Sequence, residues 1–139
     1  MLLNRGIDIN SKSNDGNTAL HWAARSNHLN IAEMLLNRGT DTNSKANNGC
    51  TALHEAANDN HLNIEEMLLN RGSDINSKDN DGSTALHMAA RYSHLNTAEM
   101  LLNRGIDTIS KNNKGFTALH IAAHNNHLNI AEMLSLIHI

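Results

Sequence analysis

Apolar residues recur along this chain in two short groups that have the spacing of helices. Leu20, Ala23 and Ala24 are spaced i, i+3, i+4, which predicts a short amphipathic helix with a small-residue face. Residues 41–49 are rich in Asn, Ser, Lys and Gly, which indicates a turn or short hairpin. A second apolar group predicts a second helix, and it consists of Leu29, Ile31, Met34, Leu35 and Leu36.

Polar residues at the ends of these groups predict where the helices begin and end. The Thr18 hydroxyl can cap the first helix, and His21, three residues on, can reach back as Glu or Gln does in a capping box. Asn27 suits a left-handed stop between the helices. Gly39 suits the end of the second helix, with Arg38 favourably placed for the helix dipole.

The whole arrangement repeats every 33 residues. The block Thr-Ala-Leu-His occurs at 18–21, 51–54, 84–87 and 117–120, and the eight glycines fall into two series with the same period. One such unit cannot bury its apolar stripe alone, so the period predicts a stack of units with a shared core. We expect one domain over residues 1–139, made of a partial repeat 1–12, repeats 13–45, 46–78 and 79–111, and a truncated last repeat 112–139.

The unit resembles an ankyrin repeat. The matching residues of one copy are Gly16, Thr18, Leu20, His21, Ala23, Ala24, His28, Leu35, Leu36, Gly39 and Asp41. The resemblance implies an all-α solenoid of helix-turn-helix units joined by hairpin-like turns. It also implies a non-catalytic scaffold that binds a protein partner on a concave face, formed by the hairpin tips and the exposed side of each first helix.

Two series of positions depart from the family pattern. Alanine replaces the family's proline at the first helical position, and we expect Ala→Pro to stabilise there; the positions are Ala19, Ala52, Ala85 and Ala118. Asn or Ser replaces the inter-helix glycine at Asn27, Asn60, Ser93 and Asn126. Ser93 is the least suited of these to a left-handed backbone, so we expect strain at that turn.

Positions that differ between the repeats are the candidates for partner contact, because the constant ones build the scaffold. Trp22, Arg25, Arg91 and Tyr92 are of types enriched at binding hot spots. Neutral drift at exposed positions is the alternative explanation, and Trp22 also has a packing alternative. The full candidate set is Asn17, Trp22, Arg25, Ser26, Cys50, Glu55, Asn58, Asp59, Ser83, Met88, Arg91, Tyr92, Phe116, His124 and Asn125.

Composition narrows the remaining function classes. The net charge of −3 and the lack of a basic run argue against nucleic acid as a partner. No apolar run approaches membrane-spanning length, and the single cysteine favours a reducing, cytoplasmic setting, with the nucleus also compatible. Neither end reads as a polar capping repeat, so we expect a piece of a longer array, or end-to-end self-association through uncapped termini.

Ten histidines raise the question of a metal site, and eight of them follow the repeat period, which favours structural roles. In the family, the first histidine of each repeat bonds its threonine and the neighbouring repeat, and the second supports the inter-helix turn. A zinc site at His120, His124 and His127 is the minor alternative. With no nucleophile–base pair or phosphate loop evident, we predict no enzyme and no cofactor. A structural spacer without a dedicated ligand is the competing function.

Overall fold

The computed structural model describes residues 7–137, and within them every regular element is an α-helix. The predicted all-α architecture of helix-turn-helix units is confirmed. The first six residues of the predicted partial repeat 1–12 lie outside the described residues. The helices are α1 (Ala19–Arg25), α2 (Leu29–Asn37), α3 (Ala52–Asn58), α4 (Leu62–Asn70), α5 (Ala85–Tyr92), α6 (Leu95–Asn103), α7 (Ala118–His124) and α8 (Leu128–Ser135).

The first helix of each unit begins as predicted. Thr18 has an extended backbone, and its hydroxyl accepts the backbone N–H of His21 at 3.4 Å. The His21 ring in turn accepts the backbone N–H of Thr18 at 3.0 Å, so two otherwise unpaired donors of the first turn are satisfied. The same reciprocal capping box begins α3, α5 and α7.

The turn between the two helices of each unit requires a left-handed residue. Asn27, Asn60 and Asn126 supply it with φ of 58° to 60°. Ser93 occupies the same position with φ of 60° and adopts the left-handed conformation without the side-chain amide of its counterparts. This confirms the predicted backbone at Ser93, where a residue other than Gly or Asn is conformationally strained.

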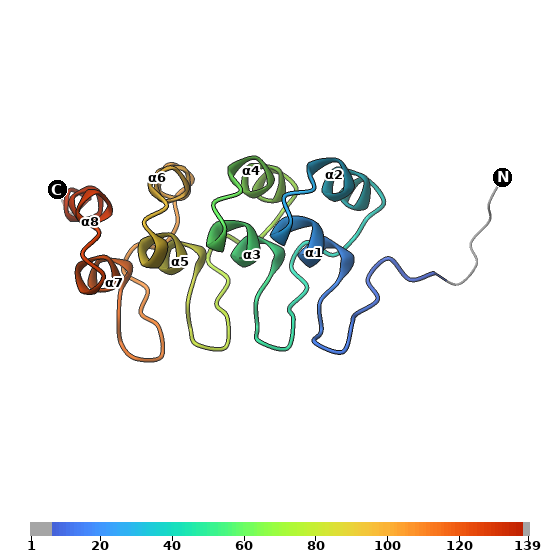
Figure 1. Ribbon diagram of the computed structural model, residues 1–139, viewed down its shortest axis with the longest axis horizontal. Coiled ribbons are helices and arrows are strands. Elements are labelled where there is room, and N and C mark those ends of the chain that lie inside the picture. Colours follow the sequence, from blue (N-terminus) through green and yellow to red (C-terminus); the bar gives the residue numbers. More distant parts are fainter. Residues whose placement is uncertain (1–6, 138–139) are drawn as a thin grey trace.

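The helices form two layers that run the length of the stack. Figure 1 shows α1, α3, α5 and α7 in one row, α2, α4, α6 and α8 in the other, and the hairpin loops extending beyond the first row. Successive first helices pack against one another, as do the two helices of each unit. Fully buried alanines such as Ala24, Ala57 and Ala90 let the helices approach closely, and Leu20, Leu53 and Leu86 fill the core between the layers.

Neighbouring hairpins are joined by hydrogen bonds that recur at the repeat period. The side-chain amide of Asn47 donates to the carbonyl of Asn14 at 3.0 Å, and that of Asn80 donates to Asn47 at 2.8 Å. The ammonium group of Lys45 donates to the carbonyl of Lys78 at 2.8 Å. These bonds fix each hairpin against the next, so the tips lie in register along one side of the stack.

Candidate functional site

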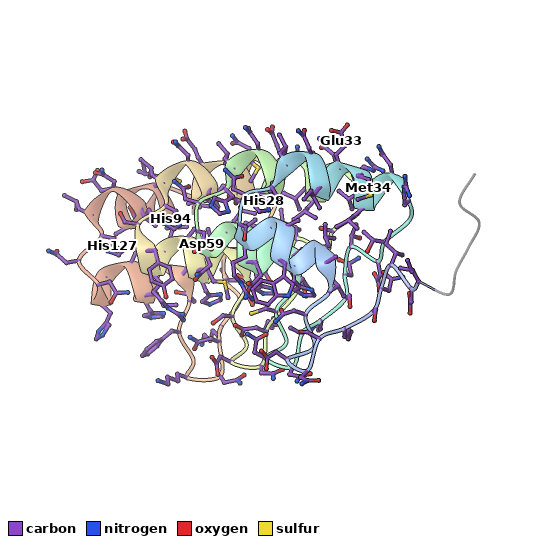
Figure 2. All side chains as sticks on the ribbon, turned by 45° about the vertical axis from the view of Figure 1, so that its right-hand side comes forward. His28, Glu33, Met34, Asp59, His94 and His127 are labelled. Atoms are coloured by element: carbon purple, nitrogen blue, oxygen red, sulfur yellow. The ribbon has the colours of Figure 1, made fainter. Side chains whose placement is uncertain are left out.

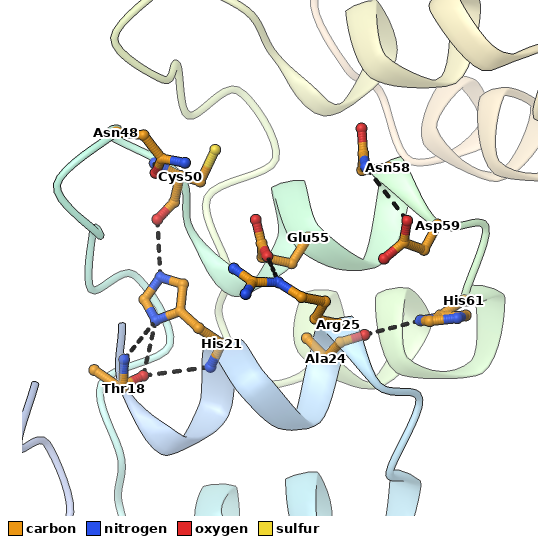
Figure 3. A network of polar contacts seen from close by, with 10 residues as sticks. All are labelled: Thr18, His21, Ala24, Arg25, Asn48, Cys50, Glu55, Asn58, Asp59 and His61. Atoms are coloured by element: carbon orange, nitrogen blue, oxygen red, sulfur yellow. Dashed lines mark hydrogen bonds and ion pairs between the residues drawn. The ribbon is translucent and has the colours of Figure 1, made fainter. Parts of the chain in front are cut away.

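The exposed sides of α1, α3, α5 and α7, together with the adjoining hairpin tips, form a continuous surface that we call the first-helix face. The capping-box histidines of α1, α3 and α5 join each unit to the next hairpin. His21 Nε2 donates to the carbonyl of Cys50 in the next hairpin at 2.8 Å (Figure 3). His54 and His87 make the equivalent bonds to Ser83 and Phe116, each at 2.9 Å. The role implied for the first histidine series is therefore seen in these three units.

These bonds also determine the protonation of the three histidines. Nδ1 of His21 accepts a backbone N–H while Nε2 donates to a carbonyl, which is the pattern of a neutral ring. Burial lowers the pKa of His21, His54 and His87 below 6.5, although the bond to the next hairpin partly opposes this effect. The rings are therefore structural hydrogen-bonding groups and are held in their neutral form.

Three predicted contact residues lie together at the first repeat boundary. The Arg25 guanidinium lies over the Trp22 ring, 4.4 Å from its centroid. The same guanidinium pairs with the Glu55 carboxylate of the next repeat, as Figure 3 shows. Trp22 remains 47% exposed, so its ring is available to a partner while Arg25 is held by two neighbours.

A second cluster lies at the boundary between the last two units. A cavity of about 370 Å³ opens there, and five of the predicted contact residues line it: Ser83, Arg91, Phe116, His124 and Asn125. Tyr92 is adjacent in sequence, 49% exposed, and its ring lies 6.0 Å from the Arg91 guanidinium carbon. The structure thus groups residues that are up to 42 positions apart in the sequence.

Four of the predicted contact residues are buried, which corrects the expectation that the variable positions all lie on the surface. Asn17, Cys50 and Ser83, which directly precede the capping threonines, are buried, and so is Met88 of α5. Burial raises the pKa of the Cys50 thiol to about 12, so this cysteine is not a reactive nucleophile.

The other predicted residues lie toward the end of the first helices. Ser26 and Asp59 are exposed, whereas Asn58 is half-buried and its amide donates to the Asp59 carboxylate at 3.3 Å. Asp59 is close to the inter-helix turn (Figure 2), so it lies at the edge of the first-helix face.

The second histidine series lies at the inter-helix turns. Nδ1 of His61 donates to the carbonyl of Ala24 in the preceding repeat at 2.9 Å, and His94 and His127 make equivalent bonds. Figure 2 shows His94 and His127 in a row between the two helix layers. For the proposed zinc set, Nδ1 of His120 and Nδ1 of His127 are both engaged in hydrogen bonds. Within residues 7–137, no three His, Cys, Asp or Glu side chains are grouped closely enough for a metal ion.

One buried polar pair was missed by the sequence analysis. Glu65 of α4 is 0% exposed and accepts a hydrogen bond from the Thr97 hydroxyl of α6 at 2.9 Å. Its other carboxylate oxygen has no partner among the described residues. Burial raises the pKa of Glu65 to about 7, against a smaller lowering by the Thr97 bond. A comparison between repeats could have found this pair. The positions equivalent to Glu65 in the other repeats hold alanine, and those equivalent to Thr97 hold isoleucine.

Comparisons with known proteins agree with this architecture. A family model described as ankyrin repeats (3 copies) matches residues 1–79 and 68–138. No curated protein matches the chain. Across the described part of the chain, none of the helices is both long and apolar enough to cross a lipid bilayer. The repeated capping boxes, the two helix layers and the family match together show that this chain belongs to the ankyrin-repeat family.

Proposed function

We propose that this chain binds a protein partner through its first-helix face and carries out no catalysis. Ankyrin repeats are generally protein–protein interaction modules, and the first-helix face corresponds to the concave surface expected from the family pattern. The single observation that carries the proposal is that residues which differ between repeats meet on this face, around a cavity of about 370 Å³.

The side chains exposed on this face have the character of binding anchors. Trp22, Tyr92 and Phe116 are the only aromatic residues of the chain, and all three are substantially exposed. Aromatic side chains and arginine are enriched at protein–protein interfaces and at their energetic hot spots. The exposure of all three aromatic rings on the face that also carries Arg25 and Arg91 therefore supports a partner-binding role.

A four-residue variant tests the proposal. Trp22, Arg25, Arg91 and Tyr92 are replaced together by alanine, and binding to an affinity-captured partner is compared with that of the wild type. The matched control replaces Met34, Arg38, Arg71 and Leu128, which have two arginines and two apolar side chains exposed on the other layer. Binding lost in the first variant alone supports the proposal. A partner retained by the first variant contradicts binding through the first-helix face, and the absence of any specific partner favours the structural spacer.

The side of α7 that faces away from α5 is the basis of a second proposal. His120 and Ala123 are exposed, whereas the equivalent His87 and Ala90 are covered by the following unit. This face suits a further helix pair, and we propose that a second copy of the chain can cover it. Sedimentation equilibrium tests this: association that rises with concentration and is weakened by Ala123→Glu supports it, and a monomer at all concentrations contradicts it.

A further inference from the structure

The two arginines at equivalent positions of the first-helix face have different surroundings. Arg25 and Arg91 are 66 residues apart, which is two repeat periods. Arg25 pairs with the carboxylate of Glu55, which lies 30 residues further along. The residue 30 positions after Arg91 is Ile121, which has no charge to offer. Arg91 thus lacks the carboxylate that its counterpart has.

A cavity is present where that carboxylate is missing. Arg91 and Ile121 both line the cavity of about 370 Å³ between the last two units. Neither of the two ion pairs formed within the described residues includes Arg91. The guanidinium therefore faces an open volume with its charge uncompensated by a neighbouring acid at pairing distance.

The charge around the cavity is opposite in sign to that of the whole chain. Arg91 and Lys114 line it, and Asp81 is its single carboxylate, so the lining carries one net positive charge. The chain as a whole carries a net charge of −3, so this local excess of positive charge stands out. A negatively charged group would be attracted to this cavity.

Further features of the cavity suit a carboxylate on a peptide. Phe116 is exposed and Ile121 is buried at the wall, which gives apolar contact for a side-chain stem. Ser83 also lines the cavity, and its buried hydroxyl has no hydrogen-bond partner among residues 7–137. A hydroxyl donor and a guanidinium together match the acceptor oxygens of Asp or Glu.

We propose that this cavity binds an acidic side chain of the protein partner, with Arg91 pairing with the incoming carboxylate as Arg25 pairs with Glu55. This inference rests on the proposed function and specifies the chemistry of the partner. The partner segment is an acidic peptide with an apolar residue next to its Asp or Glu. Its carboxylate pairs with Arg91, which has Ile121 where Arg25 has Glu55.

The test selects peptides from a random displayed library on the wild-type protein and measures the binding of synthetic copies by fluorescence anisotropy. Asp or Glu should be enriched, and Glu→Gln or Asp→Asn in the peptide should weaken binding about tenfold, between the effects known for exposed and buried pairs. Arg91→Gln should weaken binding about equally, and added salt should weaken it further. The matched charge control is Arg38→Gln on the other layer, which should leave binding unchanged.

A second variant tests the proposal by giving Arg91 a carboxylate partner within the chain. Ile121→Glu places a carboxylate where Glu55 stands relative to Arg25, so it should displace the acidic peptide while the chain stays folded. If this buried substitution unfolds the chain, Arg91→Gln alone decides the outcome.

The outcomes separate this inference from the proposed function. Selected peptides that depend on Trp22 and Tyr92 but show no acidic enrichment and tolerate Arg91→Gln overturn the acidic partner and leave the proposed function standing. Peptides that bind the four-alanine variant as well as the wild type, or a library that yields none, count against both.

Discussion

Replacing Glu65 by glutamine should stabilise the chain, and the gain should grow with pH. The Glu65 carboxyl is fully buried, with one oxygen bonded to Thr97 and the other without a partner in the described structure. Burial raises its pKa from the ordinary 4.5 to about 7. Each unit of pKa difference between the folded and unfolded states corresponds to about 1.4 kcal/mol. The ionised carboxylate therefore opposes folding by about 3 kcal/mol.

The direction of the effect follows from proton binding. The unfolded chain releases the Glu65 proton near pH 4.5, whereas the folded chain keeps it until about pH 7. Between these values the unfolded state binds fewer protons, so the free energy of unfolding falls as pH rises, and above about pH 7 the loss is complete. Glutamine does not ionise, so the variant escapes this loss.

Few charged groups complicate the assignment to Glu65. The helices packed against α4 carry Glu33, Glu55 and Glu99, and α4 itself carries Glu66. Burial alone raises the pKa of Glu65, against a smaller lowering by the Thr97 hydroxyl, so none of these carboxylates accounts for the shift. Glu33 points away from the stack, as Figure 2 shows.

The buried histidines act in the opposite direction and make a matched comparison necessary. His21, His54 and His87 have pKa values below 6.5, so stability present above pH 6.5 is lost as pH falls below it. Urea unfolding of wild type and Glu65→Gln, followed by circular dichroism at each pH, cancels their contribution. Glu99→Gln on the exposed side of α6 is the control, and it should differ little from wild type at any pH.

A difference in unfolding free energy between wild type and Glu65→Gln that stays constant from about pH 4.5 to about pH 8 would contradict this prediction. That result would mean that the folded-state pKa of Glu65 is ordinary and that the carboxyl is not desolvated. A variant that loses stability relative to wild type as pH rises would also contradict the prediction.

Three further substitutions test the backbone. Ala19→Pro should raise the free energy of unfolding by about 0.4–1 kcal/mol in urea titrations, because Ala19 is the exposed first residue of α1 and the residue before it is extended; a loss would contradict the predicted fit. Ser93→Gly should raise it by about 1 kcal/mol, because it relieves a left-handed φ of 60°, and an unchanged value would show that the turn is unstrained. Gly49→Ala should lower the thermal midpoint more than Gly39→Ala. Both glycines have φ of +83°, but only at Gly49 would an added Cβ lie 2.6 Å from the backbone nitrogen of Asn80. Equal losses would contradict the close packing of the hairpins.

Local features of the fold could be predicted from the sequence because they depend on neighbouring residues. The capping box joins Thr18 to His21 within a single turn, and a left-handed stop needs only the residue type at Asn27. The repeat period supplied the stacking, since no single unit can bury its apolar stripe.

The features that sequence reasoning missed depend on contacts between repeats. The position of Cys50 varies between repeats as a surface position would, yet Cys50 is buried. It lies at the boundary between two repeats, where His21 of the preceding repeat bonds its carbonyl. The Arg25–Glu55 pair spans 30 residues and follows from how α1 meets α3. The sequence identified Arg91 as a candidate, but the cavity beside it appears only when the last two units are stacked.

Where this chain binds its partner is tested most directly by mapping a selected acidic peptide onto it, using amide chemical-shift changes in a ¹⁵N-labelled sample. The shifted amides should cluster around Arg91, Phe116 and His124 on the first-helix face, with α2 and α4 unaffected. Shifts concentrated on the layer of α2, α4, α6 and α8 would contradict this prediction.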